Sequence, residues 1–233
     1  MERPEFYNKF MGELWQRDLA FVNYRIEAAK KLVRRFVPKN SKILEIGCGN
    51  GLVTRELCKI AQSVTATDLS AVAIENCRRY VKGAKNLTYY IGNIARSELA
   101  QNFRNYDAIV LCDVLEHIPI VERKDLFEFI KLAMKPDGSV ILSWPVPEAQ
   151  KNNPQIIEEP VDWVEICELS GLLPYYFSYV DVDSTNQYVY CVLKKQIPFI
   201  KITRTPSFRI SNFMKKWLQR LRNLRLLLIE EHK

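Results

Sequence analysis

The residues from Lys42 to Gly51 constrain the fold more than any other part of the chain. The apolar run Lys42-Ile-Leu-Glu-Ile-Gly47 has the composition of a buried strand and leads into a turn with glycine at positions 47, 49 and 51. A helix over about 51–61 follows. Such a turn lets a ligand approach the backbone closely, because glycine has no side chain. The helix N-terminus adds unpaired N–H groups and positive potential, which suit an anion. This unit therefore predicts a ligand site at the end of the strand.

Short apolar runs rich in β-forming residues alternate with helix-like segments from residue 41 to 195. This alternation is typical of a parallel sheet. The predicted strands are 42–47, 63–67, 87–91, 106–112, 139–144, 175–181 and 187–193. The predicted helices are 51–61, 70–81, 121–134 and 161–170; Ser70 caps the second and Gly171 ends the fourth. We expect an α/β fold with a seven-stranded, mostly parallel sheet, one antiparallel edge hairpin and helices on both faces.

Two segments flank this predicted domain of residues 41–195. Residues 1–40 are rich in aromatic side chains and contain a predicted helix over about 17–36, so we expect a helical lid. Residues 196–233 form a basic C-terminal extension with a predicted amphipathic helix at 211–229. That helix could contact an anionic membrane surface, a polyanionic substrate or another subunit, or it could pack on the domain.

The net charge of +7 belongs to this extension. Residues 196–233 hold nine Lys and Arg against Glu230 and Glu231, whereas residues 1–195 hold 25 of each sign. A neutral domain offers no general attraction for nucleic acid. No apolar run approaches the roughly 20 residues that span a bilayer, and the N-terminus lacks an apolar signal core, so we expect a cytoplasmic protein that could touch a membrane peripherally.

The cysteines and histidines argue against a zinc site or a disulfide framework. The six cysteines are scattered without a Cys-x-x-Cys pair, and the chain has two histidines.

Asp68 suggests the class of ligand. It ends the second predicted strand, seventeen residues beyond Gly51, where its carboxylate can accept hydrogen bonds from both hydroxyls of a ribose. A dinucleotide fingerprint would need glycine at position 52, which is Leu52 here. The two observations predict a nucleoside ligand other than a dinucleotide.

The chain resembles the class I S-adenosylmethionine (SAM)-dependent methyltransferases, whose first motif is acidic-x-Gly-x-Gly-x-Gly. The order of motifs over about 41–195 also matches: Asp68, then Gly92-Asn93-Ile94, then Tyr106 to His117, then Leu132 to Gly138. "Asp113-Val-Leu-Glu116-His117-Ile" and "Asn23-Tyr-Arg25-Ile" look like the ubiquinone-biosynthesis O-methyltransferase branch and its small-molecule relatives. The resemblance implies a Rossmann-like fold and SAM as the cofactor, with S-adenosyl-L-homocysteine as its product.

The resemblance also implies residue roles. Arg25 would pair with the SAM carboxylate, Gly47 would approach the amino-acid moiety, Asp68 would bind the ribose, and Cys112 would offer its backbone to the methionine part. Asn93-Ile94 would meet the adenine; the family usually has Asp at position 93, but an amide can still pair with the adenine amino group. The complete predicted cofactor set is Arg25, Glu45, Gly47, Gly49, Asp68, Leu69, Asn93, Ile94 and Cys112.

His117 is the catalytic candidate. It follows the fourth strand, near the expected position of the methyl group, and an imidazole can take a proton from a hydroxyl acceptor near neutral pH. It could instead only brace the loop. Asp113, Glu116 and His117 stand at i, i+3 and i+4, so they could present two carboxylates and an imidazole to a divalent ion if they shared one helical turn. In the ubiquinone-biosynthesis O-methyltransferases that this segment resembles, the same spacing is associated with Mg²⁺. We assign no metal to this chain.

We therefore predict methyl transfer from SAM to a hydroxyl, with an amine as second choice, of a small-molecule acceptor that could be lipophilic or glycan-like. Its pocket should come from residues 1–30, the loop at 145–160 and the C-terminal extension. The alternatives are an RNA or protein methyltransferase that docks through the extension, and a SAM-binding regulator without turnover.

Overall fold

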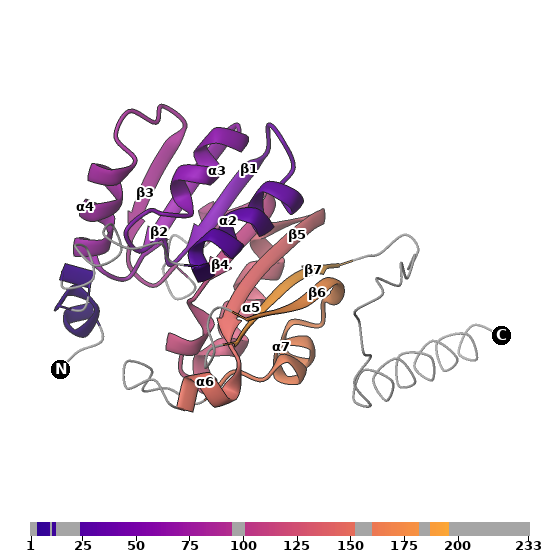
Figure 1. Cartoon of the computed structure of the whole chain (residues 1–233). Coiled ribbons are helices and arrows are strands. Elements are labelled where there is room, and N and C mark those ends of the chain that lie inside the picture. Colours follow the sequence, from indigo (N-terminus) through magenta and orange to yellow (C-terminus); the bar gives the residue numbers. More distant parts are fainter. Residues whose placement is uncertain are drawn as a thin grey trace. The chain divides into compact units, whose positions relative to one another are not determined.

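The computed structural model describes residues 4–9, 11–12, 24–94, 101–151, 160–181 and 187–195 (Figure 1). The predicted C-terminal helix at 211–229 lies outside these residues, as does the first part of the helix predicted at 17–36. No helix among the described residues is long and apolar enough to cross a bilayer.

A seven-stranded sheet with the order β3-β2-β1-β4-β5-β7-β6 forms the centre of the domain (Figure 1). Five strands run parallel, and β7 runs antiparallel to both β5 and β6. The strands are β1 Lys42–Ile46, β2 Ser63–Asp68, β3 Leu87–Ile91, β4 Tyr106–Cys112, β5 Met134–Pro145, β6 Leu173–Asp181 and β7 Gln187–Lys194. The predicted fold class is confirmed, including its antiparallel hairpin.

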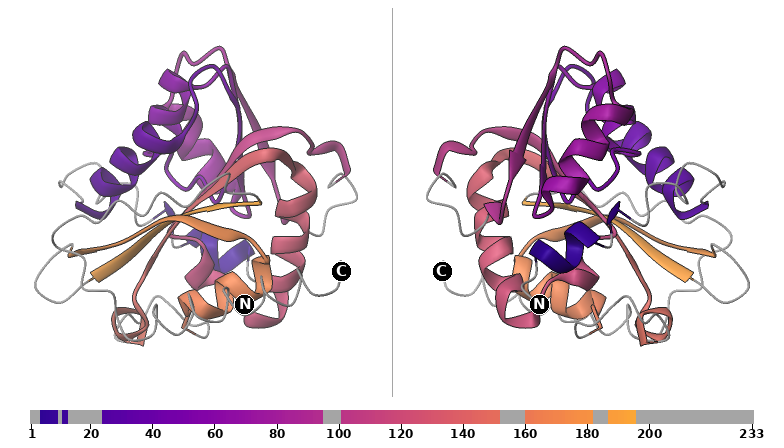
Figure 2. Two further views of the ribbon diagram at one scale, coloured as in Figure 1. Left: turned by 90° about the vertical axis from the view of Figure 1, so that its right-hand side faces the viewer. Right: turned by 90° about the vertical axis from the view of Figure 1, so that its left-hand side faces the viewer.

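Helices cover both faces of the sheet (Figure 2). They are α2 Tyr24–Phe36, α3 Thr54–Ile60, α4 Ala71–Tyr80, α5 Ile120–Ala133, α6 Pro147–Lys151 and α7 Trp163–Ser170, and a 3₁₀ turn, η3, lies at Leu115–His117. Residues 4–9 and 11–12 are also helical, and we call them the N-terminal helical segment.

Apolar periodicity decides which face each helix covers. The residues Ala29, Leu32 and Val33 of α2 are buried with α3 against β1, β4, β5 and β7. On the other face, α5 and α7 bury side chains such as Phe127, Ile130 and Ile166 against β4 and β5. Spacings of three and four residues place such side chains on one stripe of a helix. α2, the only described part of the predicted 17–36 helix, is therefore part of the domain core.

Two predicted helix boundaries are confirmed in detail. Ser70 accepts a hydrogen bond from the backbone N–H of Ala73 and so caps α4. Gly171 ends α7 in the left-handed conformation with φ 59°.

The segment 134–151 differs from the prediction. β5 begins at Met134, five residues before the predicted strand at 139–144, because Met134 pairs with Tyr106 before the register shifts. A short helix, α6, also interrupts the loop predicted over 145–160; Gln150 stabilises it by donating to the carbonyl of Pro145 and accepting from the N–H of Val161 at 2.9 Å.

Candidate cofactor and catalytic site

The glycine turn after β1 depends on glycine for two reasons. Gly47, Gly49 and Gly51 all have positive φ, at 73°, 50° and 83°, where other residues are strained. A Cβ atom on Gly47 would also collide with the side chain of Val114. The N–H groups of Gly47 and Cys48 both donate to the carbonyl of Thr67, at 2.8 and 2.9 Å. The turn is thereby held between the ends of β2 and β4.

Asp68 ties this turn to the end of β2. Its Oδ2 accepts a hydrogen bond from the Gly49 N–H and its Oδ1 one from the Ser70 N–H, both at 2.9 Å. Burial raises the pKa of Asp68 above its ordinary value, and these hydrogen bonds act in the opposite direction. Each carboxylate oxygen has a second lone pair, so Asp68 can accept further hydrogen bonds from a ligand.

Glu45 lies beneath the turn. Its side chain is buried, and within the described part of the chain its Oε2 has no hydrogen-bond partner. Burial raises the pKa of Glu45 well above its usual range, and the neighbouring Asp68 raises it further. A buried acceptor without a partner is costly, so a cationic or hydrogen-bond-donating ligand at the turn fits this residue.

The ends of β2 and β3 lie side by side, because Asp68 pairs with Ile91 in the parallel ladder. The N–H of Gly92 donates to the Asp68 carbonyl at 2.8 Å. Beyond it, Asn93 is exposed, whereas Ile94 is buried in the core. Leu69, after Asp68, is half-buried. The structure thus brings together the residues that the sequence assigned to the ribose and the adenine.

The end of β4 turns sharply at Asp113. This residue has φ 58°, its N–H donates to the Ser143 carbonyl at 2.9 Å, and its Oδ1 accepts from the Ser143 hydroxyl at 3.1 Å. Cys112, the last residue of β4, is half-buried, and burial raises the pKa of its thiol. The turn directs the following residues, including His117, over the carboxyl end of the sheet.

Arg25 reaches the same place from α2. Its Nη1 lies 2.8 Å from Oδ2 of Asp113, and its carbonyl accepts a hydrogen bond from the Tyr190 hydroxyl at 2.9 Å. The sequence suggested Arg25 as a partner of a ligand carboxylate, and the structure shows that it has a partner in the protein as well.

The N-terminal helical segment lies across this edge of the sheet. The Tyr7 hydroxyl donates to the carbonyl of His117 at 3.3 Å, and the two rings meet edge to face with their centroids 5.8 Å apart. At the other side, Oδ1 of Asn8 accepts a hydrogen bond from the Ser70 hydroxyl at 2.7 Å. Met11 is the nearest neighbour of a Cβ built on Gly49, at 3.5 Å. The segment therefore contacts the glycine turn, α4 and η3.

Comparison with known proteins agrees with this geometry. Residues 43–138 match the family model described as "Methyltransferase domain", and this range holds the glycine turn, Asp68, Asn93 and His117. This part of the chain is therefore similar to a methyltransferase domain.

Curated proteins similar to part of this chain include ubiquinone biosynthesis O-methyltransferases. The mitochondrial one of Schizosaccharomyces pombe is 32% identical over 106 residues, which cover 44% of this chain and 37% of that protein. The one of Vibrio parahaemolyticus is 26% identical over 122 residues, which cover 52% and 48%. The matches thus span less than half the length of these relatives.

Solved structures share the fold at low sequence identity. The N-methyltransferase NodS from Bradyrhizobium japonicum WM9 in complex with S-adenosyl-L-homocysteine has a TM-score of 0.63 and 17% identity, and the match covers 78% of this chain and 97% of NodS. Magnesium protoporphyrin IX methyltransferase from Synechocystis has a TM-score of 0.64 and 16% identity, with coverages of 82% and 97%.

An ionic cluster beside η3 was not recognised in the sequence. Glu116 is buried, and burial, followed by the charge of Asp113, raises its pKa well above the ordinary value; the charges of Arg25 and Arg123 oppose this. Arg123 is fully buried, donates from Nε to the Ile118 carbonyl at 2.9 Å, and pairs with Glu165 at 2.9 Å. Arg123 and Glu165 are 42 residues apart, and nothing local in the methyltransferase motifs marks either one.

The residues at 113–117 do not offer the arrangement that we considered for a divalent ion. η3 contains only Leu115–His117, so Asp113 does not share a helical turn with Glu116 and His117. Among the described residues, no group of three His, Cys, Asp or Glu side chains could hold a metal ion. Asp113 is paired with Arg25 instead. The side chains at 113–117 therefore do not fit a metal ion, and the reaction proposed below has no step that uses Mg²⁺.

Proposed function

We propose that this methyltransferase domain binds SAM and transfers its methyl group to the hydroxyl oxygen of a small-molecule acceptor. The observation that carries the proposal is the position of Asp68. Its carboxylate is held by N–H groups of the glycine turn and of Ser70, next to the end of β3, and can still accept hydrogen bonds. That is the environment a ribose diol needs at the carboxyl end of a parallel sheet.

The surrounding side chains support SAM as the nucleoside. In the proposal, Asp68 holds the ribose, while Leu69, Asn93 and Ile94 contact the adenine. Glu45, Gly47, Gly49 and Cys112 lie at the methionine part. The acidic residues at this edge suit a sulfonium cation. Arg25 has five N–H donors, so its guanidinium can keep Asp113 and also bind the SAM carboxylate.

His117 acts as the general base in this proposal. The acceptor oxygen forms a bond to the methyl carbon, the bond from carbon to the sulfonium sulfur breaks with its electron pair going to sulfur, and the hydroxyl proton moves to the imidazole. SAM supplies the activated methyl group when bound. The contact of Tyr7 with His117 holds the ring in place, and the N-terminal helical segment, as a lid, excludes water from the aligned partners.

We also propose that the C-terminal segment 211–229 contacts an anionic membrane surface from the cytoplasmic side. Support comes from the sequence alone, since this segment is basic and carries apolar residues at three- and four-residue spacing.

Calorimetric titration with SAM tests the cofactor part. Asp68→Asn removes acceptor lone pairs, so we expect binding to weaken by about tenfold or more. Asn93→Ala, at an exposed position, should weaken it about threefold without disturbing the fold. Asp137→Asn changes an exposed Asp at the opposite end of β5 and should have no effect. Binding equal to wild type in both site variants would contradict the assignment.

Methyl transfer from radiolabelled SAM into a fractionated cell extract tests the reaction. Label in the small-molecule or organic fraction supports the proposal. Label in RNA or protein contradicts the acceptor class, and SAM binding without label in any fraction contradicts the catalytic assignment.

A further inference from the structure

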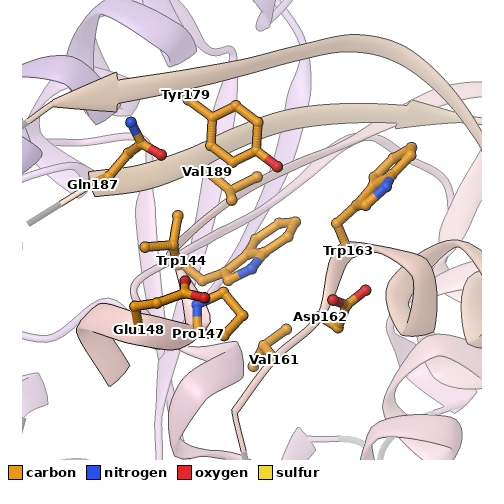
Figure 3. A pocket seen from close by; sticks show the side chains of 10 residues that line it. Trp144, Pro147, Glu148, Val161, Asp162, Trp163, Tyr179, Gln187 and Val189 are labelled. Carbon is orange, nitrogen blue, oxygen red and sulfur yellow. The ribbon is translucent and has the colours of Figure 1, made fainter. Parts of the chain in front are cut away.

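A cavity of about 300 Å³ opens at the carboxyl end of β5 (Figure 3). Its walls come from β5, the start of α6, the start of α7 and the β6–β7 hairpin. This volume lies at the lower end of the range for small-molecule pockets. Nothing in the cofactor assignment uses the cavity.

The connection to the cofactor site runs through two consecutive residues of β5. Ser143 donates its hydroxyl hydrogen bond to Asp113, whereas Trp144 lines the cavity. Successive side chains of a strand point to opposite faces, so the cavity lies on the face covered by α5 and α7, within one residue of the turn that leads to His117. The cavity and the turn at Asp113 therefore lie at the carboxyl ends of the neighbouring strands β5 and β4.

Aromatic side chains form much of the cavity wall. Trp144 and Val189 lie on neighbouring strands, paired across β5 and β7, and Trp163 and Tyr179 face them from α7 and β6 (Figure 3). Phe177 contacts both of these rings, with centroid distances of 4.7 Å to Trp163 and 5.1 Å to Tyr179. This packing gives the wall fixed aromatic faces.

The polar part of the wall is acidic. Glu148 and Asp162 both line the cavity, and none of its ten described lining residues is Lys, Arg or His. Burial raises the pKa of the Tyr179 hydroxyl, and the negative charges of Asp162 and Glu148 raise it further. The negative charges of both carboxylates therefore reach the part of the wall that Tyr179 forms. Aromatic faces next to carboxylates attract organic cations, through the ring quadrupole and through charge.

Trp144 adds a directed hydrogen-bond donor. Its side chain is fully buried, and within the described residues its Nε1 has no hydrogen-bond partner. In Figure 3 the indole lies between Val189 and Pro147, with its nitrogen on the side of Pro147 and Val161. An indole N–H can only donate, so this atom would be satisfied by an oxygen acceptor on a ligand.

We propose that this cavity binds the methyl acceptor and selects a small cationic ring compound: an amine that is protonated at neutral pH and carries, besides the hydroxyl that is methylated, a second oxygen. The amine lies between the aromatic rings and the carboxylates of Glu148 and Asp162, and the second oxygen accepts a hydrogen bond from Trp144. The inference rests on the proposed function for the role of the ligand as acceptor. The charged residues of the described wall, Glu148 and Asp162, are both acidic, so we expect anionic compounds to bind weakly.

Three probes of similar size test the charge preference: phenyltrimethylammonium, its neutral isostere tert-butylbenzene, and the anion benzenesulfonate. Binding to the full chain is followed by tryptophan fluorescence and calorimetry, with and without SAM. We expect the cation to bind about tenfold more tightly than the isostere, and the anion not to bind. Equal or tighter binding of the neutral probe overturns the proposal.

Variants test whether the preference for the cation arises in this cavity. The double variant Glu148→Gln, Asp162→Asn should abolish the charge preference, and Asn at 162 can still cap α7, where Asp162 accepts from the Val164 N–H. Trp163→Leu should weaken cation binding severalfold. Glu128→Gln, an exposed acid on α5 outside the cavity, is the matched control and should change nothing. An unchanged preference in the double variant overturns the proposal.

Titration of the same samples with SAM separates the two hypotheses. Normal SAM binding in a protein that shows no cation preference contradicts only the cavity assignment. Cation binding without SAM binding contradicts the proposed function instead.

Discussion

Arg25 and Asp113 form an ion pair between α2 and the end of β4, with 2.8 Å between Nη1 and Oδ2. Their side chains are only 26% and 13% exposed. Arg25 precedes the segment 43–138 that matches the methyltransferase family model, so this pair connects the matched domain to the helix before it. The charge of Arg25 also lowers the pKa of Glu116, so it favours ionisation of that carboxyl, whereas burial and the charge of Asp113 oppose ionisation.

Replacing Arg25 should therefore cost both stability and cofactor affinity. In Arg25→Met, Asp113 loses its counter-charge while it stays partly buried beside Glu116, so we expect a loss of about 1–3 kcal/mol of unfolding free energy. SAM should bind about tenfold more weakly. Urea unfolding and calorimetry measure the two effects.

Arg34→Met is the matched control, because Arg34 lies on the same helix and pairs with Glu56 at a side-chain exposure of 47%. Exposed pairs contribute about 0–1 kcal/mol. Equal losses in the two variants would mean that the Arg25 pair is an ordinary surface contact.

Gly47→Ala should be far more costly than the left-handed backbone alone explains. A Cβ at Gly47 meets the side chain of Val114, whereas one at Gly83, with φ 91°, meets nothing within 4 Å. We expect Gly83→Ala to lose about 1–2 kcal/mol of unfolding free energy, and Gly47→Ala about 2–3 kcal/mol more. Adding Val114→Ala should recover part of the difference. If chemical unfolding shows equal losses of unfolding free energy for Gly47→Ala and Gly83→Ala, the side chain of Val114 moves away from the new Cβ at no cost.

Glu116 makes stability depend on pH. Its pKa is raised in the folded state, mainly by burial, so the carboxyl is protonated in both states at low pH, and the folded state loses stability as pH rises toward the raised pKa. Glu116→Gln removes that loss. The unfolding free energy of this variant relative to wild type should therefore increase as the pH rises above the ordinary pKa of a glutamate.

Glu56→Gln should change the pH dependence of stability in the opposite direction. Burial alone would raise the pKa of Glu56, but hydrogen bonds from Lys59 and Arg34 lower it, so its small contribution is lost as pH falls. Urea unfolding over the same pH range compares the two variants. A flat difference between Glu116→Gln and wild type would contradict the buried, protonation-dependent role of Glu116.

His117→Ala should lower kcat by about 10²–10⁴ if the imidazole is the general base, with SAM affinity unchanged. In the wild type, activity should fall on the acid side as the imidazole becomes protonated, and this limb should be absent from the residual activity of the variant. A histidine that only braces η3 would instead show a lower unfolding free energy and an unaltered pH profile.

The contacts of the N-terminal helical segment predict its effect on the cofactor. Tyr7→Phe removes the hydroxyl that donates to His117 but keeps the ring contact, and Asn8→Ala removes the acceptor for Ser70. We expect the double variant to release SAM severalfold faster, since hydrogen bonds of this kind contribute about 0.5–1.5 kcal/mol each. Stopped-flow dissociation measures the rate. An unchanged rate would show that the segment does not retain the cofactor.

The sequence predicted the strands, the main helices, the cap at Ser70 and the stop at Gly171, because each depends on periodicity or on a single residue within one turn. It also placed Asp68 next to the glycine turn, since consecutive βα units bring the carboxyl ends of their strands to one edge. Neither inference needed long-range packing. It missed α6, however, which is held by hydrogen bonds from Gln150 to Pro145 and Val161 rather than by its own five-residue pattern.

Tertiary structure alone decided the partners of the charged groups and the shape of the cavity at the end of β5. Arg25 with Asp113, and Arg123 with Glu165, join residues 88 and 42 positions apart along the chain, and no local pattern selects such pairs. The cavity likewise unites Trp144, Trp163 and Tyr179 from three separate elements. Spacing along the chain determines how each element folds and which edge it ends on; side-chain packing between distant elements determines which charges are paired and which surfaces remain open to a ligand.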